Sequence, residues 1–120
     1  MKILIADDSR VMRQIVIRTL RQAGFDGHDL VEAENGKAAL DKARAEEPDF
    51  VLSDWNMPEM TGIEFLRALR AAGLRTPFVF VTSEATSEMR ETAAAAGALD
   101  LITKPFDAER FREALEPILR

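Results

Sequence analysis

The chain has 120 residues, which suffice for one domain with a single hydrophobic core and leave no room for a second. Its 47% hydrophobic and 31% charged residues are ordinary for a soluble globular protein, and no apolar stretch approaches transmembrane length, so we expect a cytoplasmic protein with no membrane contact. A net charge of −5 argues against a nucleic-acid-binding surface, and the absence of cysteine excludes disulfides and thiolate metal sites.

Short apolar runs alternate with helical patterns along the chain. The runs predicted to be strands are 3–6, 28–33, 50–52, 78–81 and 99–102. Three of them have the nearly continuous apolar character of strands that are covered on both faces. Helical spacing of apolar residues is found in three places: Met12, Ile15, Val16 and Leu20; Phe65, Leu66 and Leu69; and Phe111, Leu115 and Ile118.

Glycine and proline mark the expected boundaries. Gly24, Gly73 and Gly97 lie where helices should stop, and Pro48 and Pro77 precede the third and fourth predicted strands. Strands and helices in this alternating order predict an α/β fold, a doubly wound parallel sheet with helices on both faces. In such a sheet, ligands bind outside the carboxyl ends of the strands, so the residues there are the first candidates for a functional site.

Polar side chains with related chemistry follow four of the predicted strands. Asp7 and Asp8 follow the first, Asp54 the third, Thr82 the fourth and Lys104 the fifth. Carboxylates held together repel by about 4 kcal/mol per pair at 4 Å and an effective dielectric constant near 20, and a hard divalent cation removes that repulsion. Oxygen ligands with open positions for water favour Mg²⁺, which generally acts on phosphate. The pattern therefore indicates a site for a phosphoryl group.

Each residue also has a simpler explanation when it is taken alone. Asp8 and Ser9 are favoured N-cap residues for the first helix, and Asp54 suits a turn before a proline. Lys104 is also explained as a solvated lysine, and Thr82 as a strand-end residue with a local hydrogen bond. The joint interpretation is favoured because all four positions fall at carboxyl ends under one strand register.

Four motifs carry a resemblance to a known family. They are IADDS (5–9), LSDWNMPEMTG (52–62), VFVTSEA (79–85) and ITKPF (102–106). With these motifs the chain resembles a response-regulator receiver domain, and most closely a stand-alone receiver of the CheY type found in chemotaxis. The resemblance covers residues 1–120 as one receiver (phosphoacceptor) domain. It implies a flavodoxin/CheY-like fold: a doubly wound, five-stranded parallel sheet in the order 2-1-3-4-5 with five helices.

The resemblance implies a magnesium site. Asp8 would bind Mg²⁺ directly, together with Asp54 and the backbone carbonyl of Asn56, and Asp7 would hold the ion through water.

The resemblance also assigns the phosphoryl chemistry. Asp54 would be the phosphoacceptor, Lys104 would pair with the phosphoryl group and Thr82 would move in to bond it. The Lys104–Pro105 bond would be cis, and Gly62 would allow the loop after Asp54 its backbone conformation.

Three further positions bear on tuning and switching. Asn56 and Glu84, two residues beyond Asp54 and Thr82, lie where family members tune loss of the phosphoryl group, and we expect fairly rapid self-dephosphorylation. The family often has an aromatic residue three positions before the lysine, which rotates inward when the threonine moves. This chain has Leu101 there, a departure from the family pattern.

The leading hypothesis is a two-component signalling switch in chemotaxis or motility control. A histidine kinase or phosphotransfer protein would supply the phosphoryl group, and a downstream protein would bind the face of the fourth helix, fifth strand and fifth helix. We expect a monomer. No output domain follows the last predicted helix, so the effect would be exerted by binding another protein. The alternatives are a small Mg²⁺-dependent phosphohydrolase with an aspartate nucleophile, and a phosphorylation-independent pseudo-receiver that acts as a binding module.

Overall fold

The computed structural model describes residues 1–119 and has five strands that alternate with five helices. In chain order they are β1 (Lys2–Ala6), α1 (Arg10–Gln22), β2 (Asp29–Ala33), α2 (Gly36–Glu46), β3 (Phe50–Ser53), α3 (Gly62–Ala71), β4 (Phe78–Thr82), α4 (Ser87–Ala96), β5 (Asp100–Thr103) and α5 (Ala108–Leu119). Among these residues no helix is both long and apolar enough to cross a membrane.

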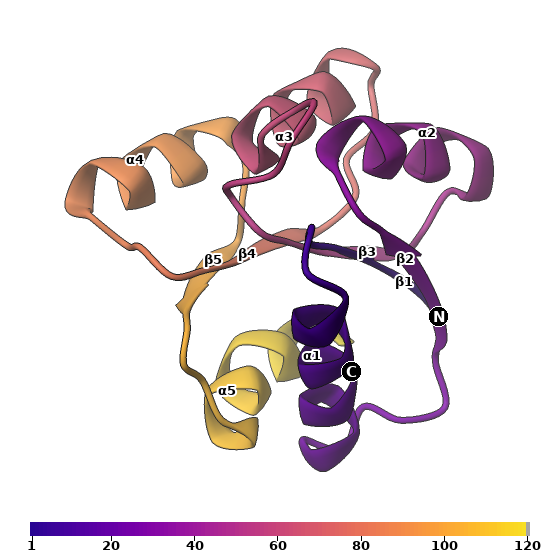
Figure 1. Cartoon of the computed structure of the whole chain (residues 1–120), viewed down its shortest axis with the longest axis vertical. Coiled ribbons are helices and arrows are strands. Elements are labelled where there is room, and N and C mark those ends of the chain that lie inside the picture. Colours follow the sequence, from indigo (N-terminus) through magenta and orange to yellow (C-terminus); the bar gives the residue numbers. More distant parts are fainter. Residues whose placement is uncertain (120) are drawn as a thin grey trace.

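The strands form one parallel sheet in the order β2-β1-β3-β4-β5. Helices α1 and α5 cover one face of this sheet, and α2, α3 and α4 cover the other (Figure 1). The order reverses between β1 and β3, because the chain leaves β1 toward β2 and then returns to the other side of β1. The predicted fold class and strand order are confirmed.

The central strands owe their position to their sequence. Strands β3 and β4 are buried along their whole length, and β1 is buried at all positions but its first. Alternate side chains of these strands enter two hydrophobic clusters, one beneath α2, α3 and α4 and the other beneath α1 and α5. Because each strand packs on both faces, its apolar run is continuous rather than alternating.

Side-chain caps fix where the helices begin. The Ser9 hydroxyl accepts from the Met12 N–H at 3.1 Å at the start of α1, so of the two cap candidates Ser9 is the cap and Asp8 is left free of that role. Thr61 and Glu64 form a reciprocal capping box at the start of α3. The cap at Ser9 leaves the acid pair before it in the loop between β1 and α1.

Candidate functional site

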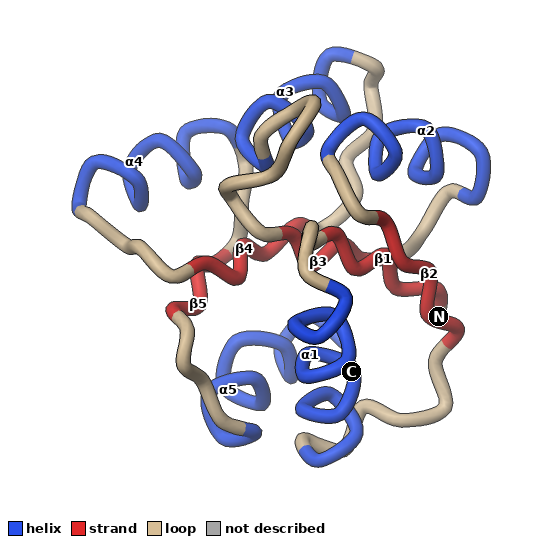
Figure 2. Tube along the Cα trace, viewed as in Figure 1, coloured by secondary structure: helices blue, strands red, loops and turns tan. Residues whose placement is uncertain are grey.

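Asp7 and Asp54 leave the sheet from the neighbouring strands β1 and β3. Ala6 pairs with Ser53 in the parallel register, so the next residue of each strand emerges at the same edge. The Asp54 N–H donates to the Ala6 carbonyl at 2.8 Å, which extends the ladder one step beyond the strands. The loops that follow these two strands lie in the middle of the view in Figure 2. The structure thus brings the two strand ends together.

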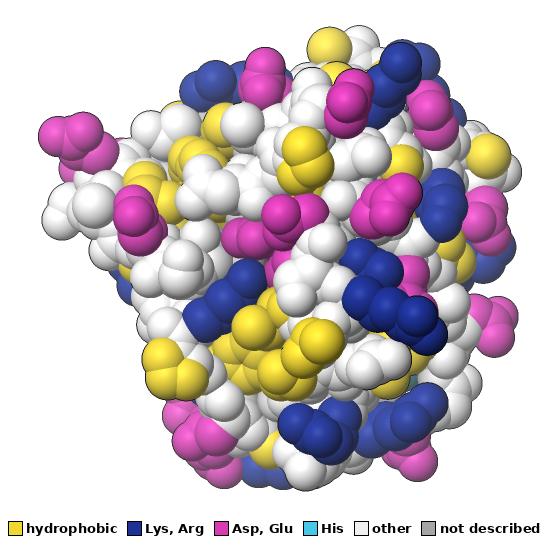
Figure 3. Space-filling view, viewed as in Figure 1, with side chains coloured by type: hydrophobic (Ala, Val, Ile, Leu, Met, Phe, Trp, Pro, Cys, Tyr) yellow, Lys and Arg dark blue, Asp and Glu magenta, His cyan; other side chains and the backbone are white. Residues whose placement is uncertain are grey.

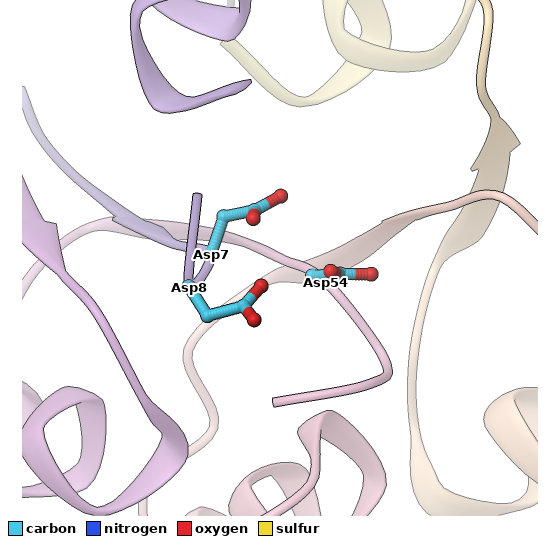
Figure 4. Close-up of side chains that lie close together, drawn as sticks. All are labelled: Asp7, Asp8 and Asp54. Atoms are coloured by element: carbon cyan, nitrogen blue, oxygen red, sulfur yellow. The ribbon is translucent and has the colours of Figure 1, made fainter. Parts of the chain in front are cut away.

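Three carboxylates meet at this edge. One oxygen from each of Asp7, Asp8 and Asp54 lies within 4.8 Å of the other two. Asp7 and Asp54 are buried, whereas Asp8 is exposed. Figure 4 shows the Asp8 side chain extending from the loop after β1 toward Asp54, and Figure 3 shows acidic side chains gathered in the middle of this face. Carboxylates this close repel one another when all are ionised.

One ammonium group offsets part of this repulsion. Lys104 Nζ lies 3.0 Å from Asp7 Oδ2 and 3.5 Å from Asp54 Oδ2, and the lysine side chain is only 15% exposed. The Lys104 N–H donates to the Thr82 carbonyl at 2.8 Å, and the Lys104–Pro105 peptide bond is cis, as the family resemblance implies. The lysine bridges two buried acids, which excludes the alternative of a solvated side chain.

Burial dominates the electrostatics of Asp54. Removal of the carboxyl from water raises its pKa above the ordinary value of 3.8. The charge of Lys104 and the Trp55 N–H, which donates to Asp54 Oδ1 at 2.7 Å, act in the opposite direction, whereas the charge of Asp7 raises the pKa further. Asp54 is therefore held where its negative charge is disfavoured, and a cation at the cluster would relieve that cost.

A buried hydroxyl without a partner lies at the end of the next strand. Thr82 ends β4 and is 0% exposed, and its Oγ1 has no hydrogen-bond partner among residues 1–119. A buried hydroxyl left unpaired costs about 1–3 kcal/mol. The oxygen of a ligand, reached by a movement of this side chain, would satisfy it.

The protein-family model described as "Response regulator receiver domain" matches residues 3–116 of this chain. The chain belongs to the response regulator receiver family. Two curated relatives are chemotaxis proteins. "Chemotaxis protein CheY" of Pseudomonas aeruginosa is 42% identical over 98% of this chain and 95% of the relative. "Chemotaxis protein CheY-3" of Vibrio cholerae is also 42% identical, over 98% and 91%.

Solved structures give the same result. The chemotaxis response regulator CheY4 of Vibrio cholerae superposes with a TM-score of 0.85 at 38% identity and covers 98% of both chains. The receiver domain of a putative response regulator NarL from Mycobacterium tuberculosis gives 0.84 at 26% identity, over 97% of this chain and 93% of that one. The CheY-like resemblance inferred from the sequence motifs is confirmed.

Position 62 of this receiver requires glycine because there is no room for a side chain, and not because the backbone has an unusual φ angle. It is the first residue of α3 and does not adopt the left-handed conformation, so the expectation of a special backbone conformation is wrong. A Cβ at this position would lie 2.1 Å from the Asp54 carbonyl oxygen and 2.9 Å from the Phe80 ring. The Gly62 N–H also donates to the Trp55 carbonyl at 2.7 Å, so the start of α3 is packed directly on the Asp54 backbone.

The three tuning and switching positions, and Trp55 beside Asp54, differ in exposure. Asn56 and Glu84 are exposed on the loops after β3 and β4. Trp55 is half-buried, and its ring centroid lies 4.7 Å from that of Phe80, so it packs on the core beside the site. Leu101 is only 3% exposed and belongs to the cluster beneath α2, α3 and α4, so its side chain is part of the hydrophobic core in this structure.

One residue beside the acid pair was not predicted from the sequence. Arg13 Nη1 donates to the Asp7 carbonyl at 2.7 Å, and its Nε donates to Glu32 Oε1 at 2.9 Å. Nothing in the sequence distinguishes Arg13 from other arginines of α1, because the contact depends on how α1 packs against the loop before it.

The donor atoms of the receiver fit a hard divalent cation. Asp7, Asp8 and Asp54 offer carboxylate oxygens only, and one of these side chains, Asp8, is exposed and has no hydrogen-bond or ion-pair partner among residues 1–119. Mg²⁺ takes few protein oxygens and keeps several waters, which suits a cluster that is open to solvent on the Asp8 side.

Replacement of Asp54 with asparagine should stabilise the metal-free receiver by about 1 kcal/mol, within the range seen when a strained functional site is relieved. The folded-state pKa of Asp54 is raised, so the folded protein binds more protons than the unfolded chain between the two pKa values. The contribution of Asp54 to stability therefore falls as the pH rises through this window, and the cost remains at neutral pH. Urea unfolding in EDTA should show the variant more stable at pH 7, with a smaller gain at acidic pH. A less stable variant at pH 7 would contradict this account.

Proposed function

We propose that this receiver is a phosphorylation-controlled signalling switch in which Asp54 accepts a phosphoryl group from a phosphohistidine of a histidine kinase or phosphotransfer protein. The observation that carries the proposal is the position of Asp54. It is a buried carboxylate whose ionised form is disfavoured, with Lys104 Nζ at 3.5 Å and two further carboxylates beside it. A divalent cation and the Lys104 ammonium group beside Asp54 would offset both the charge of the carboxylate and the negative charge that a phosphoryl group adds.

Each residue has a part in the transfer. A bond forms from an Asp54 carboxylate oxygen to phosphorus while the bond from phosphorus to the donor imidazole nitrogen breaks. Asp8, Asp54 and the Asn56 carbonyl would hold Mg²⁺, with Asp7 acting through water, and the ion supplies positive charge that stabilises the phosphoryl oxygens. Lys104 lies close enough to Asp54 to balance the charge of the transferring group.

Thr82 would carry the signal away from the site. Its unpartnered hydroxyl would donate to a phosphoryl oxygen on Asp54 and draw the loop after β4 toward the site. The family's aromatic residue, which rotates inward at this position, is replaced here by Leu101, whose side chain is already buried in the core. An inward rotation at position 101 therefore has no part in the proposed switch. The two-state change is then confined to Thr82 and residues 83–86, and the bound phosphoryl group biases it.

Loss of the phosphoryl group would follow by attack of an in-line water. Asn56 and Glu84 are exposed on the loops that border the site, where their side chains would affect the approach of that water. We expect fairly rapid self-dephosphorylation in Mg²⁺ buffer.

Two surfaces suit the proposed partners. Leu99 is 58% exposed before β5, and helix α4 buries only Ala93, so the α4–β5–α5 face offers apolar surface to a downstream protein. Val11 at the start of α1 is 66% exposed and offers apolar surface to the phosphodonor. The chemotaxis relatives suggest motility control as the pathway, with the receiver acting as a monomer in the cytoplasm.

The test is incubation with acetyl phosphate and Mg²⁺, followed by intact-mass measurement. The wild type should gain one phosphoryl group, Asp54→Asn should gain none, and Asp41→Asn, which changes an exposed acid on α2, should label like the wild type. The label should be absent without Mg²⁺. A label that survives Asp54→Asn would overturn the assignment of the acceptor.

The same samples separate the competing functions. A phosphohydrolase would turn over small phosphate esters such as p-nitrophenyl phosphate continuously, whereas the proposed switch should show negligible turnover. A pseudo-receiver would remain unlabelled by acetyl phosphate, by phosphoramidate and by phosphorylated histidine kinases.

A further inference from the structure

Arg13 connects three parts of the molecule beside the acid pair. It lies in the first turn of α1, and its side chain is only 12% exposed. Its Nη1 donates to the Asp7 carbonyl at 2.7 Å, and its Nε donates to Glu32 Oε1 in β2 at 2.9 Å. One planar guanidinium group thus joins the helix, the loop that carries the acids and the neighbouring strand.

Hydrogen bonds hold both peptide groups of Asp7, the one that contains its N–H and the one that contains its carbonyl. The Asp7 N–H donates to the Ala33 carbonyl at the end of β2 at 3.1 Å, and the Asp7 carbonyl accepts from Arg13. The Asp7 carboxylate in turn accepts from the Ser9 N–H at 2.9 Å. The peptide bond between Asp7 and Asp8 is therefore held in one orientation.

The Asp8 side chain is not held in place by contacts of its own with residues 1–119. It is exposed, and its side chain has no hydrogen-bond or ion-pair partner among residues 1–119. Figure 4 nevertheless shows the carboxylate extending toward Asp54. The direction of an unanchored short side chain depends on the backbone that bears it, because the Cα–Cβ bond is fixed by the two adjacent peptide planes.

We propose that Arg13 is a positioning residue for the cation site: by holding the Asp7 carbonyl it fixes the backbone that directs the Asp8 carboxylate toward Asp54. This inference rests on the proposed function, which requires a divalent cation at that cluster. The Arg13 side chain donates to the Asp7 carbonyl and to Glu32 Oε1, so in this role Arg13 would act on the cation only through Asp7 and Asp8.

Two other roles for Arg13 lead to different expectations. If its only effect were electrostatic, removal of a positive charge near the acids would strengthen Mg²⁺ binding. If it served stability alone, its loss would lower the free energy of unfolding and leave the Mg²⁺ dissociation constant of the folded protein unchanged. A positioning role predicts weaker Mg²⁺ binding, which is opposite in sign to the electrostatic effect.

The experiment measures Mg²⁺ affinity and stability separately in the full chain. Trp55 is the only tryptophan and adjoins Asp54, so its fluorescence during titration with MgCl₂ reports on the site. Urea unfolding in EDTA gives the stability of each metal-free variant. Arg13→Met removes both hydrogen bonds, and Arg13→Lys keeps the charge but lacks the planar fork that reaches Asp7 and Glu32 together. Glu32→Gln keeps Arg13 and an acceptor for its Nε, and serves as the control.

We expect Arg13→Met to weaken Mg²⁺ binding about tenfold or more, in the range found when groups that orient metal ligands are removed. Arg13→Lys should fall between the wild type and Arg13→Met and provides the measurement if the methionine variant does not fold. Glu32→Gln should stay within about threefold of the wild type, since one exposed charge is lost but the contact to the Asp7 carbonyl is kept.

The outcomes separate this inference from the proposed function. Unchanged or tighter Mg²⁺ binding in folded Arg13→Met and Arg13→Lys, beside a wild type that binds the ion, overturns the positioning role and leaves the proposed function intact. A wild type that shows no Mg²⁺ binding by fluorescence or calorimetry contradicts the proposed function itself.

Discussion

Replacement of Lys104 with methionine is expected to slow incorporation of a phosphoryl group at Asp54 by about a hundredfold or more, the usual cost of removing one group that stabilises a transition-state anion. Lys104 Nζ lies 3.5 Å from Asp54 Oδ2 in a site where the lysine side chain is only 15% exposed, so water screens its charge poorly. Methionine has a similar length and retains the packing of the side chain while removing the charge.

The same substitution should strengthen Mg²⁺ binding. Lys104 pairs with Asp7 at 3.0 Å, and in this way it competes with a cation for the acidic cluster. Opposite changes in labelling rate and Mg²⁺ affinity cannot arise from general damage to the site, because damage lowers both. The rate is measured from intact mass against time at saturating Mg²⁺, and the affinity from the fluorescence of Trp55.

Lys37→Met is the matched control, because Lys37 is an exposed lysine on α2. It should label at the wild-type rate. A Lys104→Met protein that incorporates the phosphoryl group as fast as this control would remove Lys104 from the proposed mechanism.

The sheet could be predicted from the sequence because three of its strands are buried on both faces. The apolar runs mark the centre of each strand, whereas the ends of the strands were predicted less accurately. The ladders of β3 and β4 extend to Ser53 and Thr82, one residue beyond the apolar runs, because backbone hydrogen bonds continue where the side chains become polar. The edge strands differ by one residue as well: β2 begins at Asp29 and β5 spans Asp100–Thr103.

The sequences of helices α2 and α4 show no stripe of large apolar residues, so their packed faces could not be predicted. The buried residues of α2 are Gly36, Ala39 and Ala43, and α4 buries Ala93 alone. Small side chains let a helix lie close to its neighbours without large apolar residues, so a pattern of large residues does not reveal its packed face.

The candidate site was predictable because parallel strands end at one edge. Asp7, Asp54, Thr82 and Lys104 follow from that rule, since each comes directly at or after the end of its strand. Two features of the site depend on packing between elements and have no local signal. The nearest acid to Lys104 is Asp7 and not Asp54, and the Thr82 hydroxyl is left without a partner.

Gly62→Ala should destabilise the receiver by about 2–3 kcal/mol, toward the upper end of the cost of overpacking, and should also slow labelling of Asp54. The added methyl group would meet the Asp54 carbonyl oxygen at 2.1 Å, and this is a backbone atom that no side-chain rotation can move away. Relief requires that α3 or the Asp54 backbone shifts, and the second shift displaces the acceptor carboxylate. Urea unfolding in EDTA measures the first effect, and intact mass against time measures the second.

Gly73→Ala distinguishes close contact from backbone strain. Gly73 has a φ of +82° and open space where a Cβ would be placed, whereas Gly62 has an ordinary helical backbone and no space. Alanine at position 73 should cost about 1 kcal/mol through its conformation and leave labelling of Asp54 unchanged. If Gly62→Ala cost no more than Gly73→Ala, the Asp54 backbone would have to yield easily. A yielding backbone is incompatible with an acceptor carboxylate held in place for phosphoryl transfer.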